Sequence, residues 1–289
     1  MIDPKTPKAW ANTLAKMWGK RFPVNVNQIA LEYTQTVCKS EPIHKITPAD
    51  VSEFEGALYK SGAKSRWYVL YNPNIGSPGR INFTIAHELG HYLLHRASVN
   101  SFECSQRDLI DYGGNDSIKR EEEANVFASY LLMPLDDFRE QIGNEKISLD
   151  LLGHCADRYN VSLTAAALKW LEYTDQRVVL VVSRDEFILW ARSSRPAFLS
   201  GVFYRKSTPV PEDSLTILNA STMTEQRNGV ELTEGIWRPN EVVREMRIVS
   251  DQYDLTISLL LLPKNAPQRY YEEEPVHDLV YDMGRLFRR

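Results

Sequence analysis

Residues 83–95 have the sequence FTIAHELGHYLLH, and the predictions of the fold and of the site start from this stretch. It contains the pattern HExxH, formed by His87, Glu88 and His91. On a helix, residues four apart lie on the same face one turn above each other, so both imidazoles can reach one zinc ion. Glu88 lies one step round the helix, where it can take a proton from a water that the ion activates. The pattern therefore predicts a buried helix with a metal-dependent hydrolytic site, and a solvated amphipathic helix is the alternative.

His95 lies one further turn along the same predicted helix. A straight helix carries it too far from an ion held by the first two histidines, so we expect a helix-end role or a contact to a ligand histidine. The metzincin pattern requires a glycine and a histidine where this chain has Leu94 and Ala97, which excludes that class.

A catalytic zinc ion usually takes three protein ligands and keeps one position open. The best source of the third ligand is the sequence EEEAN at residues 121–125. Glu121 is followed four residues later by Asn125, whose amide can hold the far ring nitrogen of a ligand histidine. Glu122 is the alternative ligand, although it has Val126 at that offset. Solvated glutamates near a helix N-terminus are the structural alternative for these side chains.

These patterns together define the expected site. The metal ligands are His87, His91 and Glu121, the general base is Glu88, and the residues expected to support the ligands are Asn125 and His95. The expected metal is Zn²⁺, and Mn²⁺ could substitute for it in vitro. No residues are assigned to any other cofactor. An oxyanion donor is also needed, and the candidates are Tyr92, Tyr112, His154 and Tyr159.

The motifs HELGHYLLH (87–95) and EEEANVFASYLLMP (121–134), in this order, resemble those of the ImmA/IrrE family of zinc metallopeptidases. The resemblance covers about residues 10–175. It implies an intracellular endopeptidase that cleaves a helix-turn-helix transcriptional repressor and so switches on a stress or mobile-element response. It also implies the ligand and base assignments given above.

The expected fold class is α+β. A zincin-like metallopeptidase domain at residues 1–175 includes a helix pair at 148–173, and a β-rich regulatory or substrate-docking domain with a C-terminal helix follows at 176–289. The expected helices are 7–20, 26–33, 82–96, 117–132, 148–159, 163–173 and a tail helix from Val276, with Asn25 and Asn82 as N-caps. The expected strands are 55–60, 66–71, 177–183, 186–193 and 255–262, and residues 72–79 and 97–116 are expected to be loops. The strand at 66–71 is a candidate edge strand for pairing with extended substrate, or else an ordinary core strand.

Composition limits the partners of the chain. The net charge is −4 and the pI about 5.9, so we expect no direct nucleic acid binding and no anionic membrane surface as partner. The helix pair resembles a helix-turn-helix, but its second helix carries only Lys169 as a basic residue, which favours packing. The N-terminal residues lack the apolar segment of a signal peptide, and the scattered cysteines are typical of reduced thiols, so a cytoplasmic location is expected.

Two other functions remain open at this point. One is a toxin or interaction module of a two-component pair, which retains the zinc site but is held inhibited by its partner. The other is a zinc-dependent enzyme that acts on something other than a peptide bond. A stable complex with an intact partner, unaffected by Glu88→Gln, would favour the interaction module.

Overall fold

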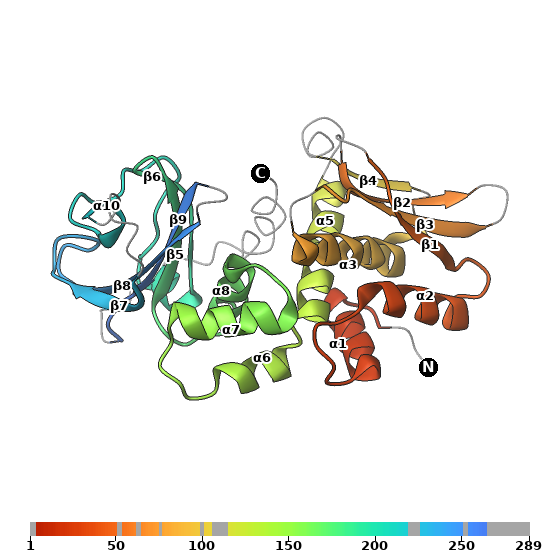
Figure 1. The fold of residues 1–289 in the computed structure, drawn as a ribbon, viewed down its shortest axis with the longest axis horizontal. Helices are drawn as coiled ribbons and strands as arrows, with labels where there is room; N and C mark the ends of the chain where they lie inside the picture. Colours follow the sequence, from red (N-terminus) through yellow and green to blue (C-terminus); the bar gives the residue numbers. More distant parts are fainter. Residues whose placement is uncertain are drawn as a thin grey trace. The chain divides into compact units, whose positions relative to one another are not determined.

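The computed structural model describes residues 4–50, 54–61, 65–74, 77–98, 101–105, 115–218, 226–250 and 254–264. They form two compact units. The first takes the described residues of Met1–Gln141 and Asp157–Ser162, and the second those of Ile142–Ala156 and Leu163–Val276. Each unit holds one sheet together with helices, so the chain is mixed α+β, as expected (Figure 1). The domain boundary at residue 175 stays a prediction.

The sheet of the first unit has the strand order β1-β3-β2-β4 among the described residues. Its strands are β1 Ile43–Pro48, β2 Phe54–Ser61, β3 Arg66–Tyr71 and β4 Ser101–Ser105. β1 pairs with β3 in parallel, and the other two pairings are antiparallel. The predicted strands at 55–60 and 66–71 are confirmed as an antiparallel pair, whereas β4 lies in a segment expected to be a loop.

Of the two alternatives for residues 66–71, the edge strand is wrong and the ordinary core strand is confirmed. β3 pairs with β1 on one side and with β2 on the other, so both of its hydrogen-bonding edges are used within the sheet. Among the described strands, the outer positions belong to β1 and β4. β1, which covers the second edge of β3, was not predicted from the sequence.

The helices of the first unit are α1 Pro7–Trp18, α2 Val26–Val37, α3 Pro78–His95, α5 Asn115–Leu132 and α6 Leu135–Ile142. Asn25 caps α2 as expected, because its side-chain oxygen accepts from the Gln28 amide at 3.0 Å. The expectation that Asn82 caps α3 is wrong. Ser77 is the N-cap, with its side chain 3.3 Å from the Arg80 amide. A serine N-cap followed by proline is typical of the start of a helix. Ser77 and Pro78 form this pair, but they lie in the segment 72–79 that was predicted to be a loop.

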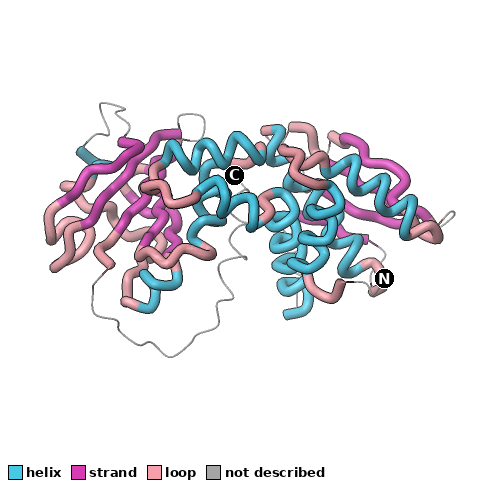
Figure 2. Tube along the Cα trace, turned by 90° about the horizontal axis from the view of Figure 1, so that it is seen from below, coloured by secondary structure: helices cyan, strands magenta, loops and turns pink. Residues whose placement is uncertain are grey.

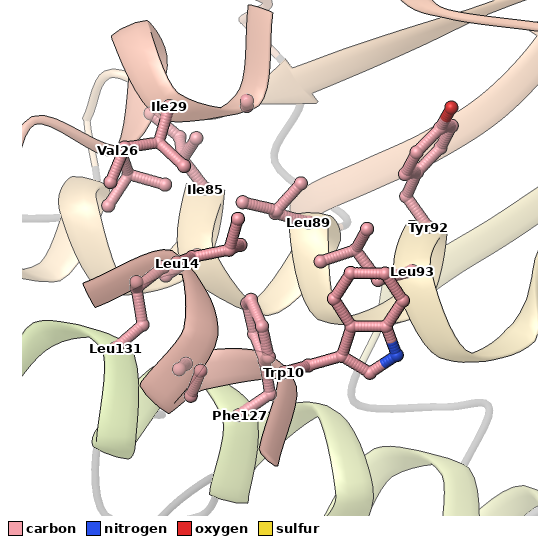
Figure 3. Close-up of a cluster of buried hydrophobic side chains, with 14 of the residues drawn as sticks. Trp10, Leu14, Val26, Ile29, Ile85, Leu89, Tyr92, Leu93, Phe127 and Leu131 are labelled. Atoms are coloured by element: carbon pink, nitrogen blue, oxygen red, sulfur yellow. The ribbon is translucent and has the colours of Figure 1, made fainter. Parts of the chain in front are cut away.

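The α3 helix is held in the middle of the first unit. It packs on α5, on α1 and α2, and on the strands β2 and β3. Figure 3 shows the buried side chains that fill the space between these helices, with Leu14 of α1, Ile29 of α2, Leu89 of α3 and Phe127 of α5 meeting in one cluster. Each such side chain contributes about 1.5–3 kcal/mol when fully buried. The helix that carries the HExxH pattern is therefore fixed by core packing on several sides.

The second unit is built on an antiparallel sheet with the order β6-β5-β9-β8-β7, whose strands run side by side in Figure 2. The strands are β5 Val178–Arg184, β6 Phe187–Ser193, β7 Gln226–Leu232, β8 Val243–Ser250 and β9 Leu255–Leu261. The helices are α7 Leu149–Tyr159, whose last residues belong to the first unit, α8 Leu163–Leu171, α9 Arg195–Leu199 and α10 Leu215–Leu218. β5, β6 and β9 confirm the predicted strands, whereas β7 and β8 were not expected.

The second helix of the predicted helix-turn-helix pair is packed against the rest of the protein on the face that carries its lysine. Lys169, the basic residue of α8, is only 1% exposed, and Ala165–Ala167 beside it are buried, so this face of α8 is packed. None of the described helices combines the length and apolar character that a membrane span requires. The tail helix expected from Val276 lies outside the described residues.

Candidate metal centre

The α3 and α5 helices bring His87, His91 and Glu121 together. The Nε2 atoms of the two histidines are 2.9 Å apart. The Glu121 carboxylate places one oxygen 3.2 Å from Nε2 of His87 and the other 3.2 Å from Nε2 of His91. One potential ligand atom from each residue lies within 4.8 Å of the others, and both histidines are buried. The three expected ligands thus form one cluster.

The protonation states of His91 and Glu121 are those that a metal requires. Burial, together with the neighbouring His87, lowers the pKa of His91 to about 4, although Glu121 opposes the shift. Burial by itself disfavours the charged form of Glu121, but contacts with both histidines outweigh it and hold its pKa well below the usual range. At neutral pH the site therefore presents a neutral His91 imidazole and an ionised carboxylate, which are the forms that bind metals.

The donor set also fits a zinc ion in size and chemistry. A tetrahedral ion at about 2.0–2.1 Å from each ligand atom separates those atoms by roughly 3.3 Å. The separations of 2.9 and 3.2 Å in this cluster lie close to that value. Two imidazoles and one carboxylate are a ligand set typical of catalytic zinc sites. The structure thus holds a candidate metal site at His87, His91 and Glu121.

The Nδ1 atoms of His87 and His91 lie beside different side chains. Nδ1 of His87 lies 3.0 Å from the side-chain oxygen of Asn125, one turn beyond Glu121 on α5. Nδ1 of His91 lies 3.1 Å from Nδ1 of His95, one turn further along α3. Asn125 and His95 are therefore both where the spacing of the sequence suggested, each beside one ligand candidate.

Glu88 lies on α3 between the two histidines and is fully buried. Its carboxylate lies against the backbone of β2 at Gly56, where an added Cβ would come within 2.7 Å of the Glu88 oxygen and 2.4 Å of the Thr84 methyl. Sequence reasoning missed Gly56. The available signal was a glycine inside a strand pattern, which often marks a close approach to another group.

Gly90 is the second glycine that shapes the site. A Cβ there would lie 3.0 Å from the Phe127 ring and 3.2 Å from Cα of Ala124 on α5. The small residue lets α3 and α5 approach closely at the height of the histidines. That approach brings Glu121, one turn before Ala124 and Asn125, to the histidine nitrogens.

Two of the oxyanion candidates are engaged elsewhere. The Tyr92 hydroxyl donates to the Glu41 carbonyl at 2.8 Å, and the ring is fully buried. The Tyr159 hydroxyl donates to the Asp137 carboxylate at 2.5 Å and is also fully buried. His154 is exposed and belongs to the second unit, and Tyr112 lies outside the described residues. The hydroxyls of Tyr92 and Tyr159 therefore each already donate a hydrogen bond within the protein.

Comparisons with known proteins support the sequence motifs. No curated protein matches the sequence. The solved structure of a Mycobacterium tuberculosis transcriptional regulator resembles the fold, with a TM-score of 0.53 and 14% identity over 89% of this chain and 76% of that chain. At that identity the likeness concerns the fold alone. Residues 39–171 match the family model of the IrrE N-terminal-like domain, Peptidase_M78, and this match contains all three candidate ligands. Residues 39–171 are thus an IrrE N-terminal-like domain of a peptidase family, as the motif resemblance predicted.

Proposed function

We propose that the protein is a zinc-dependent endopeptidase in which His87, His91 and Glu121 bind the metal and Glu88 is the general base. The observation that carries this proposal is the convergence of two buried imidazoles and an ionised carboxylate within 4.8 Å, inside a domain of a peptidase family. The arrangement of an HExxH helix beside a glutamate-bearing helix supports a zincin-like first unit.

The chain and the metal would divide the chemistry. When bound, zinc would supply Lewis-acid polarisation of a carbonyl and a readily ionised water at neutral pH. Glu88 takes the proton of the attacking water and passes it to the nitrogen of the leaving amine. Glu121 would offset part of the charge of the metal, and His87 and His91 would fix the position of the metal. The buried position of Glu88 keeps bulk water from competing for that proton.

We propose a protein substrate, namely a helix-turn-helix transcriptional repressor in the cytoplasm. The support is the resemblance of the two motifs to the ImmA/IrrE family, together with the match of residues 39–171 to a peptidase family model. In the part of the chain that the structure describes, Cys38 and Cys155 carry no disulfide, which suits a reducing compartment. An extended segment of substrate would pair with β4 rather than β3, because β4 is an outer strand among the described residues. It pairs with β2, whose Gly56 lies beside Glu88.

The test incubates the purified, zinc-loaded protein with the repressor encoded nearest to its gene. Cleavage that is lost on adding a chelator and in Glu88→Gln supports the proposal. An intact repressor that forms a stable complex with both wild type and Glu88→Gln would instead favour the inhibited interaction module. Glu121→Ala should sharply reduce the zinc content. Zinc binding that survives in Glu121→Ala and fails in Glu122→Ala would show that the ligand assignment is wrong.

A further inference from the structure

His95 and Glu123 extend the candidate metal site by two more side chains. Nδ1 of His91 lies 3.1 Å from Nδ1 of His95, and Nε2 of His95 lies 2.9 Å from a carboxylate oxygen of Glu123. The His95 side chain is 6% exposed and that of Glu123 is 34% exposed. A continuous line of contacts thus leads from a ligand candidate on α3, through a second histidine, to a carboxylate on α5.

The chemistry of imidazole allows one proton arrangement along this line. A histidine that binds a metal through Nε2 carries its proton on Nδ1. Nδ1 of His91 then donates to Nδ1 of His95, which must present its lone pair. The proton of neutral His95 therefore sits on Nε2, which donates to the Glu123 carboxylate. Glu123 thus fixes the tautomer of His95, and His95 fixes the tautomer of His91.

The two ligand histidines differ in what holds them. His87 meets a neutral amide, that of Asn125, whereas His91 meets an imidazole that is itself held by a carboxylate. A hydrogen bond that ends on an anion is stronger than one that ends on a neutral group. Partners of this kind fix the ring orientation of a ligand histidine and raise its basicity.

We propose that Glu123, acting through His95, is a positioning residue that fixes the tautomer and orientation of His91 and strengthens its bond to the metal. The inference rests on the metal site of the proposed function and adds a residue outside the HExxH pattern and its glutamate partner. It assigns the second glutamate after Glu121 a role that differs from that of a ligand. Glu123 and His95 do not touch the substrate in this account.

The first experiment measures zinc affinity by competition with a chromophoric chelator, using zinc alone and no substrate. His95→Ala and Glu123→Ala should each weaken zinc binding about 10- to 100-fold. Glu140→Ala is the matched control, because it removes one carboxylate from an exposed position in the same unit. Its zinc affinity should equal that of wild type. Wild-type affinity in a folded Glu123→Ala variant would overturn the proposal.

A double-mutant cycle separates the proposed path from a general effect of charge. His95→Ala removes the imidazole that joins His91 to Glu123, so Glu123 has no path to the ligand histidine in this variant. Adding Glu123→Ala to His95→Ala should then change zinc affinity less than twofold. A full additional loss in the double variant would mean that Glu123 acts on the metal without His95, and the proposal would be wrong.

The wild-type protein provides a test that does not depend on any variant folding. Long-range ¹H–¹⁵N spectra of the zinc-loaded protein report which nitrogen of each imidazole carries the proton. We expect His91 to be protonated on Nδ1 and His95 on Nε2. A His95 protonated on Nδ1 would contradict the inference. None of these measurements uses peptide cleavage, so a protein that shows this pattern but cleaves nothing would refute the proposed function alone.

Discussion

The side-chain oxygen of Asn125 lies 3.0 Å from Nδ1 of His87. Glu121 stands one helical turn before Asn125, and its carboxylate reaches Nε2 on the other side of the same ring. One face of α5 therefore supplies both a candidate ligand and the group that orients the neighbouring candidate ligand. Zinc affinity should depend on both side chains.

Replacing Asn125 tests the orienting half of this arrangement. Asn125→Ala removes the acceptor for Nδ1 of His87, and we expect zinc affinity to fall about 10- to 100-fold. Asn125→Asp keeps an acceptor at the same position and should retain more of the affinity. Chelator competition measures both variants. An Asn125→Ala protein that is folded and binds zinc as tightly as wild type would refute the role given to this contact.

Two helical glycines should respond oppositely to alanine. Gly90→Ala places a Cβ 3.2 Å from the backbone of Ala124, so α3 and α5 must separate slightly, and we expect a loss of about 1–3 kcal/mol in the free energy of unfolding. Gly153 of α7 has no atom within 4 Å of the added Cβ, so Gly153→Ala should gain about 0.5–1 kcal/mol from helix propensity. Chemical denaturation measures both. A stabilising Gly90→Ala would show that the close helix approach is not needed.

Gly56→Ala should affect catalysis more than metal binding. The added Cβ would overlap the Glu88 carboxylate and the Thr84 methyl, so the Glu88 side chain must move, while the candidate ligands lie elsewhere. A misplaced general base typically costs about 10²-fold or more in rate. Zinc content and cleavage rate, measured on the same preparation, separate the two effects. Equal losses of zinc and of activity would instead indicate a general disturbance of the first unit.

The buried Glu245 of β8 makes a prediction for the second unit. Its carboxylate accepts hydrogen bonds from the Trp237 indole, the Leu215 amide and the hydroxyls of Thr216 and Ser258. Glu245→Leu leaves these buried donors without their acceptor and should lower the free energy of unfolding by at least about 2 kcal/mol. Glu245→Gln keeps an oxygen for the two nitrogen donors, and its amide can donate to the hydroxyls, so it should be tolerated.

The pH dependence of stability distinguishes Glu245→Gln from wild type. Burial raises the pKa of Glu245, against the opposing effect of its hydrogen bonds. A carboxyl group with a raised pKa in the folded state destabilises the fold above that pKa, and this cost disappears as the pH falls towards the ordinary value of about 4.3. The stability of wild type relative to Glu245→Gln should therefore increase between pH 7 and pH 4.5. A constant difference would show that the carboxylate pays no burial cost.

Much of the helical framework follows from the sequence, because strong local signals mark it. Asn25 caps α2 as predicted. Of the apolar positions that predicted α1, Trp10 and Leu14 are buried, whereas Met17 is exposed. Regions without such signals were not predicted. β1 contains Lys45 and pairs in parallel with β3, although β2 is the next strand in the chain, so its pairing depends on tertiary contacts that local patterns do not encode. β8 carries Arg244, Glu245 and Arg247, of which the last two are buried, so its charged residues obscure the apolar pattern of a buried strand.

The residues of the candidate site also fall into two groups, namely those that local spacing predicts and those that it does not. The spacing of His87 to His91 and of Glu121 to Asn125 predicts which side chains share a helix face, and the structure brings these two faces together. Gly56 and Glu123 could not be assigned, because their importance depends on which element packs against them. Gly56 meets Glu88 from a neighbouring strand, and Glu123 meets His95 from a neighbouring helix. Such pairings become visible only when the elements are placed in space.

The cleavage rate of Glu88→Gln, measured on protein that carries one zinc ion per chain, tests the central claim most directly. Glu88 is proposed to move protons without binding the metal, so the variant should keep wild-type zinc content while its rate on the same protein substrate falls at least about 10²-fold. Chelator-treated wild type provides the baseline without metal. A zinc-loaded Glu88→Gln variant that cleaves the substrate at the wild-type rate would contradict the account.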